Sequence, residues 1–225
     1  MHKGNVKSSF SVQKAHEAQL QLSKHIIFED MLPKKIRFVA GVDVAYAKKM
    51  SIGTAVVLDF SSLKLVETQM ALCETHFPYV PTLLSFREIP PTLSSIKKLR
   101  TQPDVILVDG QGFAHPYRCG FASHLGLVIR KPTIGVAKSK LIGEVEEDKA
   151  QESVALLKDK GQVIGAMVTT KQNSKPVYVS VGHMVSLETA IKIVKHCTRN
   201  NRIPEPILKA HGLAALEKSE NSILP

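Results

Sequence analysis

Three carboxylates occupy positions from which they could act together on a phosphate group. Asp109 ends the apolar run "VILVD", which predicts a buried strand, and Asp43 interrupts the apolar segment "VAGVDVAY". Glu88 follows an apolar helical turn just before a pair of prolines. Carboxylates brought together repel one another, so a hard divalent cation such as Mg²⁺ would stabilise them and serve phosphate chemistry. A solvent-facing Asp43 and a surface Glu88 are the alternative interpretations.

The loop after Asp109, "GQGFAH", carries few large side chains. Gly110 and Gly112 allow tight turns and let a ligand approach the backbone closely. The pattern is neither a GxGxxG fingerprint nor a P-loop, so motif and basic charge together argue against a nucleotide-dependent oxidoreductase. A simple strand-to-helix turn is the alternative.

Two imidazoles and one amine could complete a site for phosphate chemistry. His115 lies in the loop after Asp109, Lys138 closes a short strand within the segment "GVAKSKL", and His211 lies in the last expected helix. Together they offer a cationic group and a proton-transferring group. Each of them taken alone would more often be structural or solvated.

A stiff aromatic loop precedes Glu88. Tyr79 stands between Pro78 and Pro81, with Val80 beside it. Prolines on both sides restrict the backbone and favour extended geometry in the residues before them. A rigid loop with an aromatic tip can enter a base stack and unstack it. A tyrosine packed on the edge of the core is the alternative.

These groups must be positioned by a mixed sheet. Apolar segments with short polar turns predict an antiparallel meander of three strands over residues 36–47, 52–60 and 63–74. Strands and a helix then alternate, with strands at 105–109 and 132–141, a helix at 117–129, and a hairpin at 161–170 and 175–183. We therefore expect one α/β domain over residues 1–225, with a mixed central sheet flanked by helices.

Four further helical segments are expected. The first covers residues 11–26, with Val12, Ala15, Leu22 and Ile26 on one face. Another begins after Pro81 and should stop near Arg87 or Glu88, with a second turn or helix after Pro90 and Pro91. Ser186 is the expected N-cap of a helix over 186–198, and a last helix follows "RIPEP", with a frayed tail from about residue 217.

Charge and composition narrow the class of protein. The 225 residues carry 30 Lys and Arg against 20 Asp and Glu, a net charge of +10, which favours a polyanionic partner such as nucleic acid. An acidic membrane surface is the alternative. The three widely spaced cysteines form no disulfide framework and no CxxC metal site. No apolar signal segment or membrane-length run stands out, so we expect a soluble protein of the cytoplasm or nucleus, with no membrane partner.

Six segments, taken in order, resemble one family of repair nucleases. They are "VAGVDVAY", "FPYVPTLLSFRE", "QPDVILVDGQGFAHPYRCGFASHLG", "PTIGVAKSKL", "VYVSVGH" and "RIPEPILKAH", and they extend from near residue 36 to residue 211. Their combination is similar to the endonuclease V family, which acts on deaminated purines. The resemblance implies a ribonuclease H-like fold. It also implies Mg²⁺-dependent hydrolysis of the second phosphodiester bond on the 3′ side of deoxyinosine, with Mn²⁺ as a substitute ion and 3′-hydroxyl and 5′-phosphate products.

The resemblance also implies a role for each matched residue. The metal ligands would be Asp43, Asp109 and Glu88, with Lys138 near the cleaved phosphate and His211 beside the site. The wedge that enters the duplex would be Pro78, Tyr79, Val80 and Pro81. The pocket for the flipped base would be formed by Thr82, Leu84, Gly110, Gln111, Gly112, His115, Gly120, Ser139 and Leu141.

Other substrates and classes remain open from sequence alone. Inosine-containing RNA could replace DNA containing deoxyinosine as the substrate, because contacts to a 2′-hydroxyl are not visible in a sequence. A non-catalytic binding module on the same scaffold is a third interpretation, although such a module gains nothing from three acids that face phosphates. We expect a monomer, because no segment suggests an apolar interface.

The chain departs from the family pattern at two positions. The family often has Gly after the wedge, where this chain has Thr82, and it often has "SPGH", where Val181 stands here. We predict that Thr82 narrows the base pocket and favours hypoxanthine over other deaminated bases. Matched strands that contain hypoxanthine, xanthine or uracil should therefore be cut at different rates, with hypoxanthine fastest. Equal cutting of all three would contradict this prediction.

Overall fold

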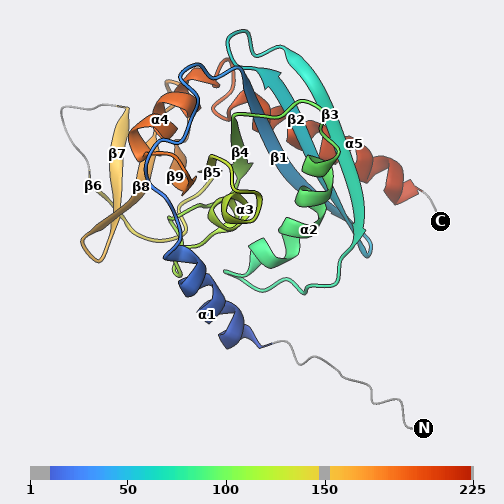
Figure 1. The fold of residues 1–225 in the computed structure, drawn as a ribbon, viewed down its shortest axis with the longest axis horizontal. Coiled ribbons are helices and arrows are strands. Elements are labelled where there is room, and N and C mark those ends of the chain that lie inside the picture. Colours follow the sequence, from blue (N-terminus) through green and yellow to red (C-terminus); the bar gives the residue numbers. More distant parts are fainter. Residues whose placement is uncertain (1–10, 147–152, 224–225) are drawn as a thin grey trace.

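A single large mixed sheet runs through the protein. The computed structural model describes residues 11–146 and 153–223, in which nine strands form one sheet (Figure 1). The strand order is β3-β2-β1-β4-β5-β9-β8-β7-β6. The strands are β1 (Phe38–Ala47), β2 (Met50–Asp59), β3 (Leu65–Glu74), β4 (Val105–Asp109), β5 (Thr133–Ala137), β6 (Glu144–Glu146), β7 (Val154–Asp159), β8 (Gln162–Val168) and β9 (Val177–His183).

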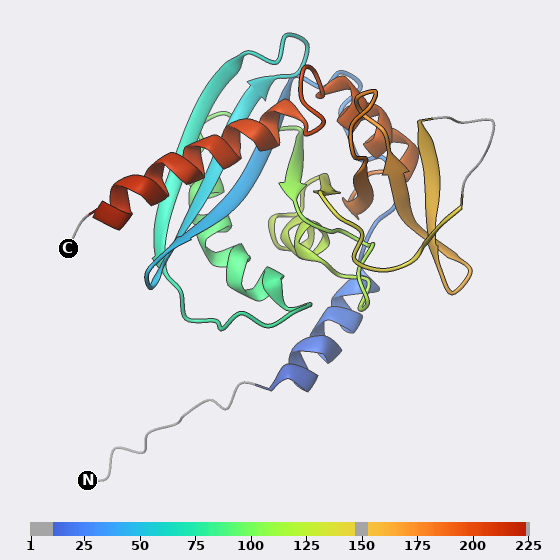
Figure 2. The same ribbon diagram turned by 180° about the vertical axis from the view of Figure 1, so that it is seen from behind.

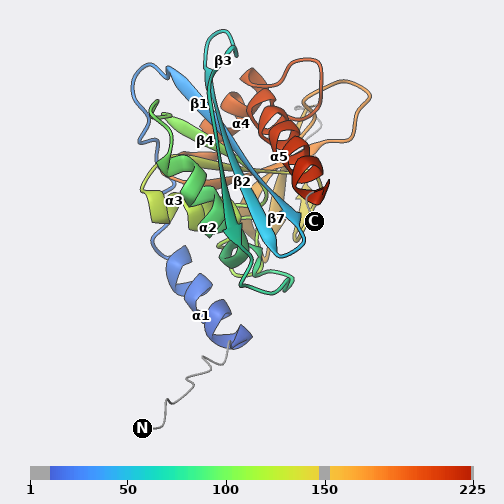
Figure 3. The ribbon, with the colours of Figure 1, turned by 90° about the vertical axis from the view of Figure 1, so that its right-hand side faces the viewer.

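Helices cover both faces of this sheet. They are α1 (Val12–Ser23), α2 (Leu84–Lys97), α3 (Phe121–Ile129), α4 (Leu187–His196) and α5 (Glu205–Ile223). Side chains alternate along the strands, so each face has its own apolar core. One core joins Ala40, Ile106 and Val108 to α2 and α3, and the other joins Val39 and Leu107 to α4 and α5. Figure 3 shows α2 and α3 on one side and α4 and α5 on the other, and Figure 2 shows α5 lying across β1 and β2.

The centre of the sheet is parallel and its flanks are antiparallel. β4 pairs in parallel with β1 on one side and with β5 on the other, whereas the remaining pairs are antiparallel. Val42 is level with Val108, so the next residues, Asp43 and Asp109, are level with each other. Parallel strands place their carboxyl ends at one edge, where α/β proteins bind ligands. The register therefore sets two acids side by side.

Most of the predicted elements are confirmed. The meander of β1, β2 and β3, the hairpin of β8 and β9, and the Ser186 N-cap, whose hydroxyl accepts from Thr189 N at 3.2 Å, all occur as expected. The mixed α/β sheet flanked by helices is confirmed as well. Several ends differ by two to four residues. Met50 and Ser51 belong to β2, and α3 begins at Phe121.

The predicted break at the proline pair is wrong. α2 continues without interruption through Pro90 and Pro91, although both residues lack the N–H that an interior helical position would donate. Its buried face includes Ile89, Pro91 and Thr92, and the Pro91 backbone lies directly against Gly53 of β2. Packing of the helix on the sheet thus overrides the local preference of proline.

Other differences lie at the two ends of the chain and at one edge of the sheet. α1 forms as predicted, but Val12 is 41% exposed, while Gln19, which was not expected in the core, is fully buried. α5 extends to Ile223, so the tail predicted to fray from about residue 217 is helical as far as that residue. β6 and β7 were not predicted, because the segment "GEVEE" is highly charged and "VALLKD" is short. Within residues 11–146 and 153–223, none of the helices combines the length and apolarity needed to cross a bilayer.

The contact between α2 and β2 gives a test of the fold. In Gly53→Ala the new Cβ would collide with the carbonyl group of Pro91. This carbonyl is part of the backbone of α2, so it cannot rotate away as a flexible side chain could. We expect a loss of about 1–3 kcal/mol in the free energy of unfolding, measured by urea denaturation. Gly212→Ala is the control, since its Cβ meets nothing within 4 Å and alanine should stabilise α5 by about 0.5–1 kcal/mol. Equal midpoints for Gly53→Ala and the parent would contradict this account.

Candidate active site

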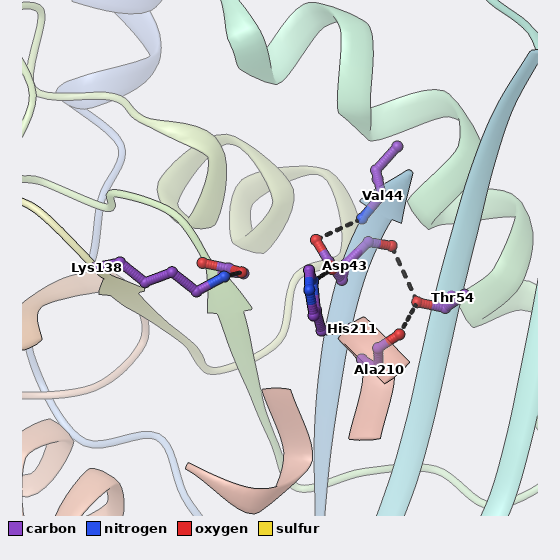
Figure 4. Close-up of polar contacts among 7 residues, drawn as sticks. Asp43, Val44, Thr54, Lys138, Ala210 and His211 are labelled. Atoms are coloured by element: carbon purple, nitrogen blue, oxygen red, sulfur yellow. Dashed lines mark hydrogen bonds and ion pairs between the residues drawn. The ribbon is translucent and has the colours of Figure 1, made fainter. Parts of the chain in front are cut away.

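Two aspartates and a histidine from three elements converge at the carboxyl edge of β1 and β4. Asp43 comes from β1, Asp109 ends β4 and His211 comes from α5 (Figure 4). One ligand atom from each of the three lies within 4.8 Å of the others. His211 Nδ1 is 2.7 Å from Asp43 Oδ2, which holds the ring against the first carboxylate. Two carboxylates and an imidazole at this spacing could hold a divalent metal ion.

Lys138 supplies the positive charge on the other side of the cluster. It follows β5 immediately, and its Nζ donates to Asp109 Oδ2 at 2.5 Å (Figure 4). The amine therefore faces the same carboxylate that the register places next to Asp43. A lysine in this position can contact an anionic group that enters the site.

Glu88 approaches the cluster from the opposite face of the sheet. It lies on α2 and is only 8% exposed, and it is not one of the three residues whose ligand atoms lie within 4.8 Å. Burial, followed by the charges of Asp43 and Asp109, raises its pKa well above the usual range of a glutamate. Burial and the Asp109 charge likewise raise the pKa of Asp43. The cluster thus concentrates more negative charge than a protein interior tolerates by itself, and this donor set fits a hard cation.

A buried threonine fixes the backbone beside two of these residues. Thr54 of β2 is fully buried, and its Oγ1 lies 3.1 Å from the carbonyl oxygen of Asp43 and 3.0 Å from that of Ala210 (Figure 4). Ala210 precedes His211 on α5. One hydroxyl therefore ties the strand that carries the aspartate to the helix that carries the histidine. Thr54 was not among the site residues predicted from the sequence.

Two cavities meet at the ends of β4 and β5. The first, of about 490 Å³, is lined by Asp43, Asp109, Lys138 and His211, and by Lys218 about two helical turns further along α5. The second has a volume of about 380 Å³ and is lined by the residues that directly follow, Gly110 and Ser139. Consecutive residues thus face different cavities, so a ligand that fills both would pass over these two strand ends.

The second cavity, called the base pocket below, contains nearly all of the residues expected there. It is lined by Tyr79, Val80, Pro81, Thr82, Leu84, Ser85, Gly110, Gln111, His115, Gly120, Phe121, Ala137, Ser139, Lys140 and Leu141. Tyr79 is 70% exposed, as a residue that projects from the protein must be. Pro78 does not line the cavity. Ser85, Phe121, Ala137 and Lys140 were not expected, although all of them except Ala137 directly adjoin a residue that was.

Gly112 has a different place from the one expected. It does not line the base pocket. Its N–H donates to Ser180 Oγ at 2.9 Å, and a Cβ at this position would collide with the carbonyl oxygen of Val181. The glycine is required because the loop packs directly on the backbone of β9. Its contribution to the pocket is therefore the path of the loop and not a surface for the ligand.

Two residues of the pocket are unusual, one in the pKa of its side chain and the other in its backbone conformation. His115 is buried, and burial lowers its pKa to about 4, so the imidazole is neutral at pH 7 and one nitrogen carries no proton. Its Nδ1 accepts the N–H of Tyr117 at 3.2 Å. Thr82 has a φ of 71°, in the left-handed region that a β-branched residue rarely adopts. A glycine would adopt this backbone conformation without the strain that threonine has.

These features define a class of protein. A mixed α/β sheet that presents paired carboxylates, a lysine and a histidine at the carboxyl edge of its parallel strands suits hydrolysis of phosphodiesters. The family model for endonuclease V matches residues 20–212, and the chain belongs to that family and is a nuclease. The endonuclease V of Thermofilum pendens is 46% identical over 204 residues, which cover 90% of this chain and 87% of that protein.

Solved structures agree with this assignment. The endonuclease V of Streptomyces avermitilis is 38% identical, with a TM-score of 0.87 over 93% of this chain and 94% of the other. Human ENDOV is 29% identical, with a TM-score of 0.85 over 94% and 100%. The Ciona intestinalis enzyme, in a complex with a 23mer DNA that contains an inosine followed by a ribo-adenosine, is 34% identical, with a TM-score of 0.84 over 93% and 97%.

The Thr54 bridge leads to a test of the metal site that needs no substrate. Thr54→Val keeps the shape of the side chain but removes the hydroxyl that ties Asp43 to Ala210. Loss of such supporting contacts typically weakens metal binding by about 10–100-fold, and we expect a loss at the lower end of that range for Mn²⁺, measured by calorimetry. Thr54→Ser, which retains the hydroxyl, should bind Mn²⁺ like the parent. Parent-like affinity in Thr54→Val would contradict the positioning role.

Proposed function

We propose that this protein is a Mg²⁺-dependent endonuclease that cuts DNA at the second phosphodiester bond on the 3′ side of deoxyinosine. The observation that supports this most strongly is the meeting of two distinct cavities at the ends of β4 and β5. One offers acids and a lysine for a phosphate, and the other offers a small, side-chain-poor pocket for a base. The family relationship and the inosine-containing DNA bound to the Ciona intestinalis enzyme support the same substrate.

The acidic cavity would perform the hydrolysis. Asp43, Asp109 and His211 would hold the divalent ion, with Glu88 completing the negative surroundings from α2. When bound, the ion supplies a lower pKa for water and neutralises charge that develops on the phosphate. Lys138, which contacts Asp109 at 2.5 Å, is placed to turn its amine toward the cleaved phosphate. His211 would hold Asp43 in the orientation that the ion requires.

The base pocket would select the lesion. A base in a duplex must leave the stack before a pocket can surround it, and Tyr79 at the exposed rim would fill the space that the base leaves. Gly110 adds no side chain to the lining and would leave room for a purine ring close to the backbone. Gly120 instead lets the loop fold tightly on itself, because a Cβ there would collide with the carbonyl oxygen of Gln111. His115 is neutral and buried and its Nδ1 accepts the N–H of Tyr117, so its Nε2 carries the proton and could donate a hydrogen bond at the edge of hypoxanthine without burying a charge.

The separation of the cavities supports the position of the cut. The base would occupy one cavity while the reacting phosphate occupies the other, so the cleaved bond need not be the one attached to the flipped nucleotide. A DNA strand that passes from Ser139 to Lys138, or from Gly110 to Asp109, would leave the base pocket and enter the acidic cavity. This arrangement favours a cut displaced along the strand from the lesion.

Cleavage mapping on end-labelled strands tests the proposal. One strand would carry deoxyinosine in DNA and a second inosine in RNA, each with Mg²⁺, with Mn²⁺ and with EDTA. We expect an ion-dependent cut one nucleotide beyond deoxyinosine in DNA, and a loss of about 10³-fold or more in Asp109→Asn, because a ligand for the ion is removed.

Controls separate the possible outcomes. Glu188→Gln alters a surface acid that pairs with Lys192 on α4, and it should cut like the parent. Faster cutting of RNA than of DNA would replace the proposed substrate by inosine-containing RNA. Tight binding of the deoxyinosine strand without any cut would leave a binding module, and cutting in EDTA would refute the need for an ion.

A further inference from the structure

Three segments of the chain line the base pocket, residues 79–85, 110–121 and 137–141, and α1 joins the first two, which are called the walls below. The first wall is the segment 79–85 that carries the tip of the wedge, and the second is the loop 110–121. Gln19 lies on α1 between them and is fully buried. Its Nε2 donates to the carbonyl oxygen of Thr82 at 2.9 Å and to that of Cys119 at 3.0 Å. One amide group therefore holds one residue of each wall.

The chemistry of Gln19 indicates a specific role. Both neighbours of its amide are carbonyl oxygens, so the NH₂ group must face them, because a carbonyl oxygen cannot donate. The remaining Oε1 is buried and has no hydrogen-bond partner among the described residues. An unpartnered buried carbonyl is unfavourable, and an apolar side chain would fill the same space without it. What only glutamine provides at this position is the pair of hydrogen bonds between the walls.

A second contact from α1 reaches the same threonine. His16 Nε2 lies 2.9 Å from Thr82 Oγ1, and the His16 ring stacks on Tyr117 of the second wall, with centroids 3.9 Å apart. Thr82 is thus held through its carbonyl group and through its hydroxyl, at a residue whose φ of 71° is strained. A glycine at this position could adopt the same φ without strain but could not make the hydroxyl contact. The histidine contact therefore depends on the threonine itself.

We infer that α1 is a clamp that fixes the opening of the base pocket, with Gln19 and His16 as positioning residues for recognition of the flipped base. This inference rests on the proposed function of the pocket. Walls that are ordered before the base arrives lose less freedom on binding, so the clamp strengthens binding of the lesion without touching it. The clamp does not contact the acidic cluster, so it should leave binding of the divalent ion unchanged.

The first test removes the amide. Gln19→Leu keeps most of the volume and loses both hydrogen bonds to the walls. We expect faster hydrogen–deuterium exchange in segments 78–85 and 115–120 without DNA, and about tenfold weaker binding of a deoxyinosine strand. Binding of a matched adenine strand and of Mn²⁺ should not change. Gln13→Leu, the same substitution on the exposed side of α1, is the control and should resemble the parent.

The second test is a double-mutant cycle that keeps Gln19 in place. His16→Ala and Thr82→Val each break the contact at the Thr82 hydroxyl, so the double variant should bind the deoxyinosine strand no more weakly than the worse single variant. Strictly additive losses would overturn the hydroxyl contact. Parent-like exchange and binding in folded Gln19→Leu would overturn the clamp as a whole.

The exchange measurement separates the clamp from the proposed function. It needs no nucleic acid, so it reports on the walls whatever the pocket binds. A parent protein that does not distinguish deoxyinosine from adenine would refute the proposed base recognition. Faster exchange in Gln19→Leu would still show that α1 orders the two walls in that case, whereas unchanged exchange would overturn the clamp independently of any substrate.

Discussion

The parallel register of β1 and β4 is the constraint on which the rest of the site depends. Because Val42 is level with Val108, the carboxylates of Asp43 and Asp109 must lie side by side at the edge of the sheet. Two like charges at this separation destabilise the folded protein unless positive groups surround them. Residues of two neighbouring elements contact these carboxylates. His211 on α5 contacts Asp43, and Lys138 at the end of β5 contacts Asp109. The position of α5 is in turn fixed by the hydroxyl of Thr54, which contacts the backbone of both Asp43 and Ala210.

The same strand ends separate chemistry from recognition. Side chains alternate along a strand, but at the end of β4 the backbone turns, and Gly110 follows Asp109 into a different cavity. The acidic cavity is held by β1, β2 and α5, whereas the base pocket is held by the wedge segment, the loop before α3 and α1. Among the described residues, α2 and the ends of β4 and β5 contribute to both. The supports that belong to one cavity alone can therefore change without disturbing the other.

The acids and the proposed wedge were predicted from the sequence because their signals are local. A strand that ends in a carboxylate, a loop of glycines and a tyrosine between prolines can each be recognised within ten residues or fewer. The supporting residues could not be found in this way. Thr54 is 156 positions from Ala210, and Gln19 is 100 positions from Cys119, so their importance emerges only when the fold brings these partners together. The helix break predicted at the proline pair was wrong for a related reason. The packing of α2 on Gly53 outweighs the local preference of proline that predicted the break.

Local rules are broken at two residues near the site, and each break has a support from a distant element. Glu88 is a buried acid with a raised pKa, held on a helix that continues through two prolines. Thr82 is a β-branched residue with a positive φ, and its two polar groups are both engaged by α1. Neither residue would take its conformation in an isolated segment. Residues in unfavourable states are expected at functional sites, where the surrounding structure holds them in place. A residue that only packs in the core has no such requirement and would adopt its preferred conformation. The strain at Thr82 and the raised pKa of Glu88 thus mark the two parts of the proposed site independently of any sequence motif.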